Sequence, residues 1–131
     1  MTGRVLVVDD EPALRQALER ALRSFGYEVA SAADPQSAYI LLAEAPFDAI
    51  LLDLRLKHTM GDAFYLALVR QWPYLRDRVI LMSGDPWSIQ EGWPPELLAC
   101  PVLAKPFTLQ SLSNLLAQIV SPGIRKQNGG A

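Results

Sequence analysis

The chain has 131 residues, of which half are apolar and a fifth are charged, and this composition is typical of one globular domain. Twelve basic and fourteen acidic residues leave a net charge of −2, which argues against nucleic-acid binding by this chain alone. The single cysteine excludes an internal disulfide framework. Early carboxylates argue against a signal peptide, and no apolar run reaches the ~20 residues of a membrane span, so we expect a cytoplasmic domain without membrane contact.

Five short apolar runs predict β-strands. They cover residues 4–8, 27–30, 49–52, 79–82 and 101–104. The first, RVLVV, is rich in β-branched residues and lacks polar alternation, as a strand does when both faces of a parallel sheet are covered.

Segments with helical periodicity separate these strands. They cover residues 12–25, 35–45, 61–72 and 109–119. Pro12 and the pair Asp34 and Pro35 suit helix starts, and Gly26 suits the C-terminal end of the first helix. Glycine and prolines at 92–95 predict that the fourth helix is short or irregular.

The alternation of strand and helix implies a doubly wound α/β fold, with a five-stranded parallel sheet and helices on both faces. Residues 1–120 would form this domain. Residues 121–131 have no apolar pattern, and we interpret them as a flexible tail or a truncated linker.

Polar residues follow four of the five predicted strands. They are Asp9, Asp10, Asp53, Ser83 and Lys105. Ligands of open parallel sheets bind at the carboxyl ends of the strands, so we expect these side chains to share one edge. Three carboxylates repel one another unless a cation such as Mg²⁺ binds between them, and a nearby lysine and hydroxyl favour phosphoryl transfer to a carboxylate. Taken singly, each residue also has a structural role open to it, as a helix cap, a turn former or a solvated lysine.

Four motifs resemble the receiver domain of bacterial two-component response regulators. They are VLVVDDEP at 5–12, AILLD at 49–53, MSGD at 82–85 and LAKPF at 103–107. The resemblance covers about residues 4–120 and implies a flavodoxin-like sheet with strand order 2-1-3-4-5. It also implies a phosphoprotein that accepts a phosphoryl group from a sensor histidine kinase or a phosphotransfer protein and then switches conformation to control an output or partner.

The resemblance assigns a role to each motif residue. Asp53 is the expected phospho-acceptor, Lys105 is expected to pair with the phosphoryl oxygens, and Ser83 is expected to hydrogen-bond to them. The expected ligands of Mg²⁺ or Mn²⁺ are Asp9 (through water), Asp10, Asp53 and the backbone carbonyl of Arg55. The peptide bond before Pro106 is expected to be cis. Catalysis would extend at most to self-catalysed phosphotransfer and autodephosphorylation.

The chain departs from the family pattern at several positions. Val102 stands where the family often has an aromatic switch residue, and Lys57 replaces a proline. Arg55 replaces the commoner Asn or Met, and our hypothesis is that it pairs with Asp85 over the site entrance and slows dephosphorylation. An exposed pair of this kind would contribute less than ~1 kcal/mol to stability.

Two tryptophans flank the irregular fourth-helix segment. Trp87 and Trp93 either cover the core or form an exposed aromatic anchor for a partner or a second copy of the chain, since tryptophan is enriched at interfaces. An exposed anchor would favour a homodimer.

Three classes of enzyme or cofactor-binding protein with similar sheets fit the sequence less well. A phosphohydrolase with an aspartate nucleophile needs a second aspartate where Arg55 stands, and a flavin-binding domain needs a phosphate-cradling first loop, which the acidic residues 9–11 oppose. A P-loop hydrolase is excluded because the sequence has no GxxxxGKS or GxxxxGKT segment. The main alternative is a degenerate receiver that acts as a phosphorylation-independent interaction module.

Overall fold

The structure is a computed structural model, and it describes residues 3–56, 59–84 and 95–120. Its main sheet has five parallel strands. They are β1 (Arg4–Val8), β2 (Glu28–Ala32), β3 (Ala49–Asp53), β6 (Val79–Ser83) and β7 (Val102–Ala104). The strands lie in the order β2-β1-β3-β6-β7, which confirms the expected 2-1-3-4-5 topology.

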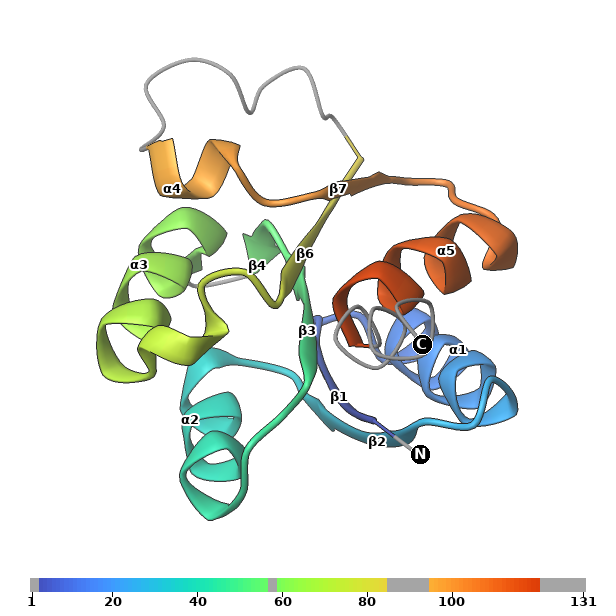
Figure 1. Cartoon of the computed structure of the whole chain (residues 1–131), viewed down its shortest axis with the longest axis horizontal. Coiled ribbons are helices and arrows are strands. Elements are labelled where there is room, and N and C mark those ends of the chain that lie inside the picture. The colour runs from blue at the N-terminus through green and yellow to red at the C-terminus, as the bar shows by residue number, and fades with distance from the viewer. Residues whose placement is uncertain (1–2, 57–58, 85–94, 121–131) are drawn as a thin grey trace, which may run out of the picture.

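Helices cover both faces of this sheet (Figure 1). They are α1 (Pro12–Ser24), α2 (Pro35–Glu44), α3 (Gly61–Gln71), α4 (Pro95–Leu98) and α5 (Leu109–Val120), with a 3₁₀ turn, η1 (Pro73–Leu75), after α3. The helices α1 and α5 lie on one face, and α2, α3 and α4 lie on the other. This arrangement confirms the doubly wound α/β fold.

The central strands alternate their side chains between two separate hydrophobic clusters. In β3, Ile50 and Leu52 belong to the cluster under α2 and α3, whereas Ala49 and Leu51 belong to the cluster under α1 and α5. All four residues are fully buried. Burial on both faces explains why this strand is apolar at successive positions instead of alternating with polar residues.

Local signals set the ends of the first two helices. Pro12 opens α1, and Gly26 follows its C-terminal cap with a φ of 98°, a conformation that favours glycine. Asp34 caps α2, because its side chain accepts a hydrogen bond from the Ser37 amide at 2.8 Å. These ends agree with the sequence prediction.

Some element boundaries differ from the prediction. The strand β2 begins one residue later and continues to Ala32, because Glu28 through Ala32 all pair with β1, including Ser31 and Ala32 beyond the predicted run. Trp72 lies just after α3 and not within it. A small antiparallel pair, β4 (Arg55–Leu56) and β5 (Thr59–Met60), occupies the connection after β3, and the hydrophobic pattern gives no signal for it.

The helix α4 is a single turn, Pro95–Leu98, and its Leu97 is buried. The rest of the segment for which a short or irregular fourth helix is predicted, residues 85–94, lies outside the described residues. Trp87, Trp93 and the tail at 121–131 lie outside the described residues, so their interpretations stay predictions. Within the described segments, every helix is too short or too polar to traverse a membrane.

Candidate functional site

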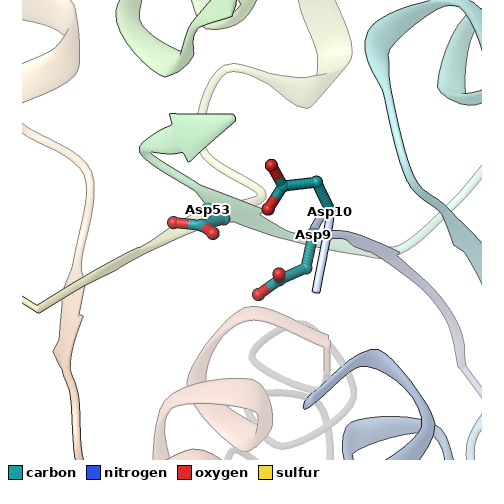
Figure 2. Close-up of side chains that lie close together, drawn as sticks. All are labelled: Asp9, Asp10 and Asp53. Carbon is teal, nitrogen blue, oxygen red and sulfur yellow. The ribbon is translucent and has the colours of Figure 1, made fainter. Parts of the chain in front are cut away.

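Three aspartates meet at the carboxyl edge of the sheet, where β1 and β3 end side by side. These strands pair in parallel with Val8 opposite Leu52, so the next residues, Asp9 and Asp53, reach this edge at the same level. Asp10 follows directly in the loop toward α1. Carboxylate oxygens of the three aspartates lie within 4.8 Å of one another, and Figure 2 shows the three side chains gathered at the strand ends.

Lys105 reaches the same edge from the end of β7. Its Nζ atom lies 3.6 Å from Asp9 Oδ2 and 3.5 Å from Asp53 Oδ2, so one ammonium group pairs with two carboxylates. The backbone amide of Lys105 donates a hydrogen bond to the Ser83 carbonyl at 2.7 Å, which ties the ends of β6 and β7 together. Ser83 is buried, and the Lys105–Pro106 peptide bond is cis.

Asp9 is the most deeply buried acid of this site. Its relative exposure is 0%, against 5% for Asp53. Burial raises the pKa of the Asp9 carboxyl above its ordinary value; the Glu11 amide and Lys105 oppose this shift, and the charges of Asp53 and Asp10 add to it. The Oδ2 atom of Asp9 is buried and accepts no hydrogen bond from the described residues, although it pairs with the Lys105 ammonium.

The donor set of this site fits a divalent cation. When ionised, three carboxylates face one ammonium group, which leaves an excess of two negative charges. Asp9 Oδ2 has no hydrogen-bond donor among the described residues, and carboxylate oxygens suit both Mg²⁺ and Mn²⁺. Asp9, Asp10 and Asp53 are therefore the side chains that would hold the expected metal.

Hydrogen bonds to Asp9 fix the loop from β1 to α1. Its amide donates to the Ala32 carbonyl at 3.1 Å, and its Oδ1 atom accepts from the Glu11 amide at 2.8 Å. The Nη1 atom of Arg15 donates to the Asp9 carbonyl at 2.6 Å. Arg15 was not among the site residues predicted from the sequence, although its place one helical turn after Glu11 directs it toward this loop.

The remaining predicted residues are only partly placed. The backbone of Arg55 lies in β4 and pairs with Met60. Val102 is half-buried in β7 and packs against the hydrophobic core. Lys57 and Asp85 lie outside the described residues, so the ion pair between Arg55 and Asp85 stays a prediction.

Comparison with known proteins identifies the family of the chain. The family model of the response regulator receiver domain matches residues 5–117. The chain is 43% identical over 93 residues to the transcriptional regulatory protein AruR of Pseudomonas aeruginosa, covering 64% of this chain and 35% of that protein. It is 30% identical over 113 residues to the probable chemotaxis protein CheY of Rhizobium etli, covering 83% of this chain and 85% of that protein. The solved structure of the chemotaxis response regulator CheY4 of Vibrio cholerae matches with a TM-score of 0.79 at 30% identity, covering 91% of this chain and 99% of that one.

A parallel sheet with an acidic carboxyl edge and a lysine after its last strand is the arrangement that the receiver motifs of the sequence predict. The chain belongs to the response regulator receiver domain family. It shares its flavodoxin-like fold with the CheY4 structure. The chain spans 35% of the length of AruR, so the activity of that whole protein belongs to a longer chain.

Proposed function

We propose that Asp53 accepts a phosphoryl group in a reaction that depends on Mg²⁺ or Mn²⁺, and that the chain then switches conformation to control an output or a partner. The donor is a phosphohistidine on a sensor histidine kinase or a phosphotransfer protein. One observation carries this proposal: Lys105 Nζ lies 3.5 Å from Asp53 and 3.6 Å from Asp9, at an edge where three carboxylates converge. This arrangement supplies a nucleophile, a cation site and positive charge for phosphoryl oxygens.

The proposed reaction is a displacement at phosphorus. A carboxylate oxygen of Asp53 attacks the phosphorus atom, the P–N bond of the phosphohistidine breaks, and its electron pair leaves with the imidazole. The product is an acyl phosphate on Asp53. A Mg²⁺ ion held by the three aspartates, with the Arg55 carbonyl as a further ligand, would neutralise charge on the phosphoryl oxygens. Lys105 adds a second positive charge beside Asp53.

The proposed switch follows from the phosphoryl group itself, which replaces the single carboxylate charge of Asp53 with about two negative charges and adds new acceptor oxygens. The ammonium group of Lys105 pairs with Asp9 and Asp53, and new phosphoryl oxygens would compete for it. Ser83 would donate its hydroxyl to the same oxygens, and this difference in contacts shifts the balance between two conformations. Because the Lys105 amide is bonded to the Ser83 carbonyl, the ends of β6 and β7 would respond together. The elements α4, β7 and α5 are the proposed readout surface.

This function is signalling and not turnover of a small substrate. Catalysis is confined to self-catalysed phosphotransfer and autodephosphorylation, with Arg55 as a proposed modulator of the second reaction. A degenerate receiver finds no support in the described geometry, because the three aspartates and Lys105 converge. A homodimer that uses Trp87 or Trp93 stays a prediction.

Intact mass spectrometry tests the proposal. Incubation with acetyl phosphate and Mg²⁺ should add about 80 Da, the mass of one phosphoryl group, to the wild-type protein. The Asp53→Asn variant should show no gain, and a chelator should remove the gain from the wild type. An unmodified wild-type protein at every Mg²⁺ concentration would overturn the proposal and favour a phosphorylation-independent interaction module.

A further inference from the structure

Arg15 contacts the backbone of the acidic loop and not one of its carboxylates. The side chain is half-buried on the first turn of α1, and its Nη1 atom donates to the Asp9 carbonyl at 2.6 Å. A short hydrogen bond from a guanidinium is charge-assisted and stronger than one between neutral groups. Arg15 therefore links α1 to the peptide that joins Asp9 to Asp10.

This contact completes the anchoring of Asp9 on three sides. The amide is held by Ala32 at 3.1 Å and the side chain by the Glu11 amide at 2.8 Å, while Arg15 holds the carbonyl. Because a peptide unit is planar, fixing the Asp9 carbonyl also fixes the direction in which the chain enters Asp10. Arg15 therefore helps to set the position of the Asp10 Cα atom, from which the Asp10 carboxylate reaches the cluster with Asp53.

We propose that Arg15 is a positioning residue for the divalent cation: it holds the Asp9–Asp10 peptide so that the Asp10 carboxylate faces Asp53. The identity of the cation rests on the proposed function. Groups that orient metal ligands through a hydrogen bond typically contribute about tenfold or more to metal affinity. Arg15 would act in this way without touching the metal.

The charge of Arg15 makes the proposal sharply testable. A guanidinium near three carboxylates repels a divalent cation, so an effect of charge alone would make Mg²⁺ bind more tightly when Arg15 is removed. A positioning role predicts that Mg²⁺ binds more weakly when Arg15 is removed. The direction of the change in affinity therefore distinguishes the two effects.

The experiment is a calorimetric titration of MgCl₂ into the metal-free full chain. Arg15→Met, which loses the donors and the charge, should bind Mg²⁺ about tenfold more weakly than the wild type. Arg15→Lys, which keeps the charge and a donor, should recover most of that loss. Arg20→Met removes an exposed charge from the same helix and should bind Mg²⁺ like the wild type. Wild-type or tighter binding by Arg15→Met would overturn the proposal.

A measurement on the metal-free protein checks the mechanism directly. The amides of Asp9 and Glu11, which donate hydrogen bonds to the Ala32 carbonyl and to Asp9 Oδ1, should exchange their hydrogens faster in Arg15→Met than in Arg20→Met, because the loop loses an anchor. Circular dichroism in EDTA confirms the fold of each variant, and Arg15→Gln replaces Arg15→Met if the apolar variant aggregates, with the same loss of affinity expected. Unchanged exchange together with unchanged Mg²⁺ affinity would refute the positioning role.

The phosphorylation assay separates this inference from the proposed function. Excess Mg²⁺ should restore the acetyl-phosphate reaction of Arg15→Met to the wild-type rate, because only the affinity for the cation is changed. If the wild type is never phosphorylated but Arg15→Met still binds Mg²⁺ more weakly, the positioning role holds and the proposed function fails. If the wild type is phosphorylated and Arg15→Met binds Mg²⁺ normally, the proposed function holds and the positioning role fails.

Discussion

The acids at the two edges of the sheet differ in their hydrogen bonding. At the amino edge, just before β3, the Asp48 carboxylate accepts a hydrogen bond from the Arg4 amide at 2.7 Å, and Arg78 Nη1 donates to the Asp48 carbonyl at 3.2 Å. At the carboxyl edge, Asp9 Oδ2 is buried without a hydrogen-bond donor among the described residues, beside two further carboxylates. The Asp48 carboxylate is hydrogen-bonded within the protein. The carboxyl edge, in contrast, has a carboxylate oxygen without a hydrogen-bond donor, as a site that would bind a cation requires.

A cleft at the amino edge shows that an open space alone does not identify the site. It has a volume of about 560 Å³ and is lined by residues 46–48, 73–74 and 76–78. Its charged side chains are balanced, with Asp48 and Asp77 beside Arg76 and Arg78. Excess charge, and not hollow space, distinguishes the carboxyl edge.

The largest expected effect is on metal binding. Asp10→Asn should lower the affinity for Mg²⁺ on the order of 100-fold, because it removes a charged oxygen ligand from the three-carboxylate site. Calorimetric titration measures this change. Asp77→Asn neutralises an exposed acid at the amino edge and should leave the affinity unchanged. Equal losses in the two variants would show that overall charge, and not the site, attracts the cation.

A second variant probes the amino edge. Asp48→Ala should lower the free energy of unfolding by about 2 kcal/mol, because the Arg4 amide loses a charged acceptor. Denaturant titration in EDTA measures the loss, and Asp48→Asn, which keeps an acceptor oxygen, should lose less. Unchanged stability in Asp48→Ala would contradict the view that this edge is built for stability.

At the carboxyl edge, neutralising an acid should have the opposite effect on stability. The raised pKa of Asp9 means that its ionised form is disfavoured in the folded protein, so Asp9→Asn should unfold less readily than the wild type in EDTA at pH 7. Asparagine can still accept the hydrogen bond from the Glu11 amide.

The pH dependence of this difference follows from the direction of the shift. Below the ordinary value of 3.8, Asp9 is protonated in the folded and the unfolded chain, and the two proteins should be similar. As the pH rises above 3.8, the unfolded chain ionises first, so the wild type loses stability relative to Asp9→Asn. Unfolding curves at several pH values measure this gap, and Mg²⁺ should narrow it by binding the folded wild type. A difference in stability between the wild type and Asp9→Asn that widens toward low pH would contradict the raised pKa of Asp9.

The smallest expected effect concerns an acid that follows β2 at the carboxyl edge. The Ser37 amide lowers the pKa of Asp34 below its ordinary value of 3.8, so Asp34 stabilises the fold above that pH and loses this contribution as the pH falls below it. Asp34→Ala should lower the unfolding midpoint slightly at pH 7, whereas Asp34→Asn, a good helix cap, should not. An equal drop in both variants would point to charge instead of capping.

The sequence was sufficient to predict the sheet and the edge where the site lies. Continuous apolar runs mark β1, β3 and β6, and the aspartates and serine that end them mark their carboxyl ends. The start of β2 and the pairing of β4 with β5 were missed, because they depend on backbone partners and not on hydrophobic periodicity. The contact between Arg15 and the Asp9 carbonyl was missed for the same reason, since a long side chain bound to backbone leaves no trace in spacing.

The alternation of β3 between two hydrophobic clusters has a consequence for insertions and deletions. Removing one residue from this strand would exchange the sides on which Ile50 and Leu51 are buried, and would move Asp53 away from its level beside Asp9. The length of the strand therefore fixes the position of Asp53 beside Asp9. Length changes during evolution should accumulate in the connections between elements, where they leave both clusters and the acidic edge intact.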